Sequence, residues 1–305
     1  MSKSSAVLAP LTPTQRRLLD AATDIMTNQT KRIDFLHTVQ CQCVLPYRNP
    51  GEDVREWDRH QGNATLRIEA GSALDPKTNE YVKLGLPYGE MPRLVLIHLA
   101  SEAIRTNSPV VDVEGSMTAF ARSLGIDTSG PQLRHLKDQL TRLANATVRM
   151  GFVEQGHAFQ VNTQIVGALD LWYPSEASQK VLWPSTVRLS GDFFASLGRH
   201  AVPLDNRAIR GIAHSSLALD IYTWLAQRMH RIPAERSQFI PWTGLYDQFG
   251  QGYARIRDFR RNFLKTLRNV HSVYPGARME ADEKGMTLYR SPPPVASNSF
   301  TISSS

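Results

Sequence analysis

Apolar residues recur at every third or fourth position through several stretches of the chain, and this spacing predicts amphipathic helices. Helices are expected at residues 88–108, 116–125, 132–146, 215–232, 243–250 and 253–270. A further helix is expected near the N-terminus, where Thr12 suits the cap and Pro13 the first helical position. Gly125 and Gly250 follow helical stretches and are expected to end them.

Alternating apolar and polar residues predict strands between these helices. Strands or hairpins are expected at residues 37–45, 65–71, 109–113, 147–172, 181–190, 238–242 and 277–291. Residues 47–64 are polar and rich in turn formers, so we expect a loop there, and we expect residues 201–205 to be a plain connection. Turns near Gly156 and at residues 282–285 would divide two of the strand regions into hairpins.

One order of elements occurs twice along the chain: helix, strand, short helix, third helix and hairpin. This order describes a winged helix, whose third helix commonly lies in the DNA major groove while the hairpin contacts the flanking backbone. The sequence therefore predicts an α+β fold with tandem winged-helix domains. Residues 1–84 are expected to form a partly flexible N-terminal region whose role is open. We expect a first winged helix at residues 85–198, for dimerisation and auxiliary DNA contact, and a second at residues 199–291, for the main DNA contact. Residues 292–305 are expected to be a disordered tail.

The bulk composition fits a folded chain with an anionic partner. With 305 residues, of which 41% are hydrophobic and 21% charged, the chain can bury a sizeable core and is long enough for two domains. The formal net charge of +7 favours nucleic acid over a membrane surface as the partner. No apolar run is long enough to span a membrane and the N-terminus is a poor signal peptide, so we expect a cytoplasmic protein.

Motifs for catalysis or metal binding are sparse. Cys41 and Cys43 are too few for a four-cysteine zinc site, and we expect two reduced thiols. The nine histidines form neither H-E-x-x-H nor the paired histidines of nicking enzymes, and the sequence has no phosphate-binding G-x-x-x-x-G-K-[ST] loop and no G-x-S-x-G. Glu52 and Glu56 lie in a polar stretch, where carboxylates are ordinarily solvated. We therefore expect no catalytic residues, no metal, no cofactor and no enzyme activity.

The predicted helix at 253–270 carries the strongest candidate site. Its apolar stripe is formed by Ile256, Phe259, Phe263, Leu267 and Val270. Projected at 100° per residue, one sector opposite this stripe holds Arg257, Arg261, Lys265 and Arg268. A solvated helix face would normally interleave acids at i±4, but this helix offers only Asp258. Because arginine suits bidentate contacts to guanine and phosphate, we expect this sector to contact nucleic acid.

The other basic candidates have weaker support. Arg255 projects to the other flank of the same helix and Arg260 near the edge of its apolar stripe, where each could brace the fold or reach a phosphate. The following hairpin carries cations that suit a wing on the DNA backbone, namely Arg278, Lys284 and Arg290. In the equivalent helix of the first half, the cations are scattered: Arg134, Lys137 and Arg142. Auxiliary DNA contact and a structural or dimerisation role stay equally open for them.

Several short stretches between about residues 85 and 292 are, in combination, specific for one protein family. They are "LPYGEMPRLVL", "SEAIRTNS", "LWPSTVRLSGDFF", "PLD", "SSLALDIYTWLAQR", "YDQFG", "DFRRNFLKTLRNV" and "YPGARME". Together they resemble the RepA-type plasmid replication initiator family. The resemblance implies a plasmid-encoded protein that binds repeated double-stranded sites (iterons) at its own origin and recruits host replication proteins. The basic third-helix pattern of the family falls on Arg257, Arg260, Arg261, Lys265 and Arg268.

The resemblance also implies tandem winged helices, a shift between dimer and monomer, and repression of the initiator's own promoter, which bears on plasmid copy control. Three functions then stand as hypotheses. The first is a non-catalytic replication initiator, associated with plasmid and nucleoid in a bacterial cytoplasm. The second is a winged-helix transcriptional regulator, which only the resemblance separates from the first. The third is a DNA-nicking or priming enzyme, which the missing motifs disfavour. Expected partners are duplex DNA, host replication proteins and a second copy of the chain, with no membrane.

Overall fold

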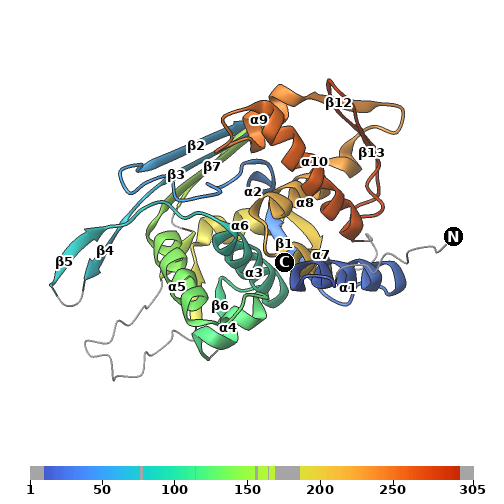
Figure 1. Cartoon of the computed structure of the whole chain (residues 1–305). Helices are drawn as coiled ribbons and strands as arrows, with labels where there is room; N and C mark the ends of the chain where they lie inside the picture. The colour runs from blue at the N-terminus through green and yellow to red at the C-terminus, as the bar shows by residue number, and fades with distance from the viewer. Residues whose placement is uncertain are drawn as a thin grey trace.

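The computed structural model of the protein describes residues 10–75, 78–113, 115–154, 157–163, 165–168 and 186–295. Outside this part of the chain lie the predicted turn at Gly156, residues 169–172 and 181–185 of the predicted strands, and the last ten residues of the predicted tail. The fold mixes helices with several small antiparallel sheets, so the predicted α+β class is confirmed (Figure 1). None of the helices in the described residues is long and apolar enough to cross a bilayer.

The N-terminal helix α1 (Pro13–Thr27) begins as the sequence predicts. The Thr12 hydroxyl accepts a hydrogen bond from the backbone N–H of Gln15, and the Gln15 side chain accepts one from the backbone N–H of Thr12. This reciprocal capping satisfies two donors that would otherwise lack partners, and Pro13 occupies the first turn. The helix packs on the second half of the chain, against α7 and α10.

The first half contains the predicted order of elements. It runs through α3 (Glu90–Thr106), β6 (Val110–Asp112), α4 (Met117–Ser123), α5 (Gly130–Asn145), β7 (Thr147–Glu154), β8 (His157–Thr163), β9 (Val166–Ala168), β10 (Thr186–Leu189) and α6 (Gly191–His200). Gly125 adopts φ +73° just after α4, a left-handed conformation that glycine tolerates best, and it ends the helix as expected.

The second half repeats this order more compactly. It runs through β11 (Ala201–Asp205), α7 (Asn206–Ile212), α8 (Ser216–Arg228), the 3₁₀ turn η1 (Met229–Arg231), β12 (Ser237–Pro241), α9 (Trp242–Phe249), α10 (Ile256–Val273), β13 (Met279–Ala281) and β14 (Gly285–Tyr289). Strand β14 lies between β12 and β13, so the hairpin pairs with the strand of its own half. Beyond it, Tyr274 donates a hydrogen bond to the Pro292 carbonyl and Val295 is buried, so the first residues of the predicted tail pack on the body.

The hairpin of the first half pairs differently. Strand β7 joins β3 (Ala64–Glu69), and with β2 (Glu56–Gln61) and β8 they form a four-stranded sheet in the order β2-β3-β7-β8. Ile68 lies opposite Val148 and Leu66 opposite Met150, and all four side chains are buried. Strand β6 pairs with β10 instead. The N-terminal region therefore supplies two strands to the sheet that contains the first hairpin.

Three local predictions are wrong in the N-terminal region and in the connection between the halves. Residues 38–42 form helix α2 (Thr38–Gln42) instead of a strand, because His37 caps it by accepting the backbone N–H of Val39. The predicted loop at 47–64 contains β2. The expected connection at 201–205 is strand β11, which pairs along its full length with β1 (Ile33–His37). A two-stranded hairpin, β4 (Ser72–Asp75) with β5 (Glu80–Lys83), projects on the side away from α10 (Figure 1).

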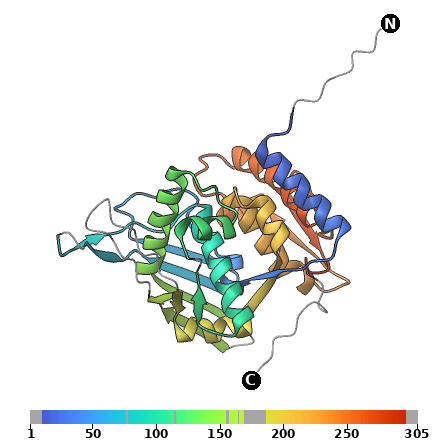
Figure 2. The same ribbon diagram turned by 90° about the horizontal axis from the view of Figure 1, so that it is seen from below.

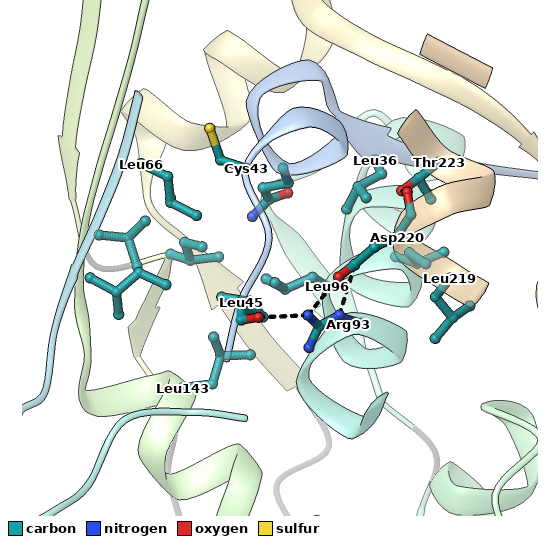
Figure 3. Close-up of a pocket in the computed structure, with 15 residues that line it drawn as sticks. Leu36, Cys43, Leu45, Leu66, Arg93, Leu96, Leu143, Leu219, Asp220 and Thr223 are labelled. Carbon is teal, nitrogen blue, oxygen red and sulfur yellow. Dashed lines mark hydrogen bonds and ion pairs between the residues drawn. The ribbon is translucent and has the colours of Figure 1, made fainter. Parts of the chain in front are cut away.

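A buried ion pair joins α3 of the first half to α8 of the second half (Figure 3). Arg93 on α3 donates to both carboxylate oxygens of Asp220 on α8, at 2.8 and 2.7 Å, and the side chains are only 6% and 8% exposed. The same guanidinium donates to the carbonyls of Leu45 and Gly89, at 2.7 and 2.6 Å. A cavity of about 30 Å³ beside the pair is lined mainly by aliphatic side chains, which gives space for about one or two water molecules and none for a nucleotide.

Candidate nucleic-acid interface

Helix α10 is held in place by the aromatic face that the sequence predicts. Phe259 and Phe263 are fully buried, and Phe263 packs edge-on against Trp242 with ring centroids 5.9 Å apart. The ring centroid of Phe249, on α9, lies 5.7 Å from that of Phe263. Aromatic pairs at these separations add to the free energy gained by burying the rings. This packing fixes the rotation of α10 about its axis and therefore fixes which residues face outward.

The predicted basic sector of α10 does face outward. Its four members, Arg257, Arg261, Lys265 and Arg268, are all exposed. Of these four, only Arg261 has an ion pair within the described part of the chain, with Asp258. From residue 255 to residue 268 the sequence has six cations and one acid, a net of +5. A row of cations with so few internal partners is an electrostatic surface suited to a polyanion.

Asp258 pairs with Arg261 of the basic sector, a contact that was not predicted from the sequence. Its Oδ1 lies 3.4 Å from Nη2 of Arg261, whose side chain is 81% exposed. An exposed pair of this kind contributes little to stability. It does restrict where the guanidinium points, and a preorganised guanidinium loses less side-chain entropy when it binds.

Arg260 is a structural residue more than a surface cation. Its Nη2 donates to the Asp282 carbonyl at 3.0 Å, and its guanidinium lies 5.2 Å from the centre of the Trp242 ring. The flank position noted in the sequence therefore corresponds to a brace between α10 and the hairpin turn. Arg255 is the cap residue of α10 and is exposed, with no side-chain capping bond. Ile256, expected in the apolar stripe, is instead 41% exposed, because it lies in the first turn beyond the reach of the core.

The hairpin β13–β14 presents its three candidate cations, Arg278, Lys284 and Arg290, on the surface. Residues 278–290 also contain three acids, Glu280, Asp282 and Glu283, so the hairpin has a net charge of zero. The Asp282 carboxylate accepts the backbone N–H groups of Lys284 and Gly285, which lowers the pKa of Asp282 and shapes the turn that carries Lys284. The hairpin therefore offers three individual cations beside the basic sector of α10, but it has no net positive charge of its own.

The candidate cations of the first half are not brought together. Arg134 is exposed near the start of α5, and Lys137 is half-buried. Arg142 is only 11% exposed and pairs with Glu52 at 2.9 Å and with Asp138 at 3.0 Å. Arg142 is therefore built into the fold, which agrees with the structural alternative left open for it.

The cysteines and histidines give no competing site in the described residues. Cys41 and Cys43 are free and buried, and burial raises the pKa of both thiols. No group of three or more His, Cys, Asp or Glu side chains in the described part is placed to hold a metal ion.

Comparisons with known proteins place the chain in a family. The sequence profile described as "Plasmid encoded RepA protein" matches residues 86–247, more than half of the chain, and its match ends before α10 begins. No curated protein matched the sequence. Among solved structures, the chain is similar to the crystal structure of selenomethionine derivatives of domains 2 and 3 of RctB, with 12% identity, a TM-score of 0.50, and coverage of 81% of this chain and 93% of that chain. A second crystal structure of RctB domains 2–3 has 12% identity, a TM-score of 0.49, and coverage of 82% and 94%.

At 12% identity, the first of these similarities concerns the fold alone. The family match rests on sequence and agrees with the resemblance seen in the quoted stretches. The chain therefore belongs to the plasmid-encoded RepA protein family and is a RepA-type replication initiator.

Proposed function

We propose that this initiator binds repeated double-stranded sites at its plasmid origin through α10, without catalysing a reaction, and recruits host replication proteins there. The observation that carries the proposal is the row of four exposed cations on α10, three of which lack an ion pair among the described residues. In this proposal the second half is a winged helix, with α10 as the recognition helix and β13–β14 as the wing.

The first half fits the same proposal as a modified winged helix. Its third helix, α5, has the right place in the order of elements, but its hairpin belongs to a sheet shared with β2 and β3. Arg142 is committed to Glu52 and Asp138. We therefore assign base reading to α10 and only auxiliary or dimerisation roles to the first half.

Footprinting on the DNA flanking the gene tests the proposal. Several direct repeats spaced by about one or two helical turns are expected for an initiator, whereas a single palindrome in a promoter would point to the transcriptional regulator. If α10 neutralises about four phosphates, log affinity should fall with log salt at a slope of roughly −3.6. A slope near zero would contradict DNA binding.

Substitutions separate base reading from phosphate contact. Arg257→Ala and Arg261→Ala should each cost about 1–3 kcal/mol on the cognate site if the arginine reads a base. Equal losses on cognate and random DNA would identify a phosphate contact instead. Lys83→Ala is the matched control, since Lys83 is an exposed cation on the hairpin that projects away from α10 (Figure 1). Incubation with supercoiled origin DNA and Mg²⁺ tests the non-catalytic part, because reproducible nicking would refute it.

A further inference from the structure

An open groove lies between helices α1, α4 and α7. It has a volume of about 620 Å³, and its lining includes the turn at Gly125 and Ile126 that follows α4 and the glycine of α7, Gly211. Two of the three helices belong to opposite halves of the repeat and the third to the N-terminal region. Figure 2 shows that helix α1 lies along the outside of the second half. One wall of the groove is formed by residues of α1, namely Arg17, Asp20, Ala21 and Asp24.

Specific contacts hold that wall in place. Arg207 of α7 donates to the carbonyls of Asp24 and Asn28, both at 2.9 Å, and its charge is paired with Asp205 at 2.7 Å and Asp24 at 3.3 Å. A Cβ atom at Gly211 would lie 2.7 Å from the Cβ of Ala21, so the two helices pack too closely for a larger residue there. The groove is therefore a built feature of the fold.

Three arginines that lack a partner among the described residues line this groove. Arg17, Arg122 and Arg210 come from α1, α4 and α7, all are exposed, and the described residues provide none of them with an ion pair or a side-chain hydrogen bond. The lining residues include four arginines and two aspartates, a net of +2, and the Arg207–Asp24 pair leaves three arginines against Asp20. Three exposed cations on one groove raise the local positive potential, which favours an anionic ligand.

The groove lies close to the C-terminal end of α10, and this proximity favours DNA as the polyanion. The Cβ position of Gly211 lies 3.5 Å from a methyl group of Val273, in the last turn of α10, and α1 packs on α10 as well. The groove therefore adjoins the C-terminal end of the proposed recognition helix. Its lining contains no aromatic side chain in the described part of the chain, so it offers no platform for stacking the bases of a single strand.

We infer that this groove binds the sugar–phosphate backbone of duplex DNA that flanks the site contacted by α10. The inference rests on the proposed function, since it concerns the same duplex. Arginine forks match phosphate geometry, and contacts to phosphate fix the position of a protein on DNA without reading its sequence. The groove would lengthen the contacted duplex on one side of the site.

Fluorescence anisotropy with three duplexes tests the inference. One duplex contains the footprinted site alone, and the other two extend it by about one helical turn of random sequence on one side or the other. Extension on a single side should tighten wild-type binding and steepen the salt slope by up to about 2.7, since each neutralised phosphate contributes about 0.9. The Arg17→Ala, Arg122→Ala, Arg210→Ala triple variant should lose that increment and keep the affinity of the wild type for the site alone.

Controls separate the possible failures. Arg16→Ala removes an exposed arginine that neighbours Arg17 but does not line the groove, and it should keep the full increment. Single variants should each remove about a third of the slope increment, which keeps the test available if the triple variant unfolds. A triple variant that retains the increment overturns the inference, including the case in which the groove instead receives an acidic protein segment. Failure of the wild type to bind any of the duplexes would overturn the proposed function itself.

Discussion

Nη2 of Arg260 lies 3.0 Å from the carbonyl oxygen of Asp282, so a residue of the basic helix is attached to the turn of the hairpin. The same carbonyl accepts a hydrogen bond from Nε1 of Trp242, at 2.9 Å. The turn is thereby tied to both α9 and α10. The hairpin cannot change its angle to the proposed recognition helix without breaking these bonds.

Replacing Arg260 should therefore reduce stability. Arg260→Ala removes a charged donor and a contact with the Trp242 ring, and we expect the free energy of unfolding to fall by about 1–2 kcal/mol. Urea unfolding followed by tryptophan fluorescence measures this change. Arg257→Ala, one turn earlier on the exposed face, should stay within about 0.5 kcal/mol of the wild type. Equal stability of the two variants would contradict the structural role of Arg260.

Asp258→Asn should change the affinity for random DNA and the preference for the cognate site in opposite directions. Removing this negative charge from a DNA-facing helix should tighten binding to random DNA, because repulsion from the phosphates is lost. It should also narrow the ratio of cognate to random affinity, because Arg261 loses the carboxylate 3.4 Å away that orients it. Competition binding on both duplexes at one salt concentration measures the two effects. An unchanged ratio would show that Asp258 does not orient Arg261 on the DNA.

The buried pair of Arg93 and Asp220 should behave as a coupled unit. Arg93→Met leaves the Asp220 carboxylate buried without its partner and should cost about 3–5 kcal/mol of unfolding free energy. The Arg93→Met, Asp220→Leu double variant should recover part of that loss, though not all, because the Leu45 and Gly89 carbonyls also lose their donor. A double-mutant cycle in urea measures the coupling. Arg16→Met, at an exposed arginine of α1, is the control and should stay within about 0.5 kcal/mol of the wild type. Additive losses in the cycle would argue against the pairing.

His37 should make stability depend on pH. Burial, with a smaller effect from His200, lowers the pKa of His37 to about 3 in the folded protein, against about 6.5 for an unperturbed histidine. Between these values the unfolded chain binds the proton more strongly, so the free energy of unfolding should fall as pH drops from about 6.5 towards 3. The His37→Asn variant should be less stable at neutral pH, because His37 bonds to Ser196 and caps α2. Its loss of stability between pH 6.5 and 4 should be smaller than that of the wild type, and parallel pH profiles would contradict the assignment.

The sequence predicts elements well where local pattern and core packing agree. Helix α10 is the clearest case, since its apolar spacing matches the buried face built on Phe259 and Phe263. The strand predicted at residues 37–45 was wrong, because the alternation of apolar and polar residues there resembles a strand. The contact that decides the structure is the helix cap formed by the side chain of His37. Strand β11 was missed because its partner β1 lies about 170 residues earlier, and no local signal reports that pairing.

The candidate site divides in the same way. Outward projection of Arg257, Arg261, Lys265 and Arg268 follows from helix geometry, so the sequence predicted it. The attachment of Arg260 to the hairpin turn depends on the neighbouring chain segment, and helix projection could indicate only that this residue lies at the edge of the core. Arg17, Arg122 and Arg210 are far apart in the sequence. The packing of α1 on α7 brings Arg17 and Arg210 to one groove, and the fold also places Arg122 of α4 in its lining.

The sheet β2-β3-β7-β8 has a consequence for how this chain can be shortened. One edge of strand β7 is covered by its pairing with β3, which the N-terminal region supplies. A fragment beginning after residue 70 would leave the β7 edge open and would remove Ile68 and Leu66, the cross-strand neighbours of the buried Val148 and Met150. An open, apolar strand edge pairs readily with another such edge. We therefore expect the N-terminal strands also to prevent self-association of the initiator through β7.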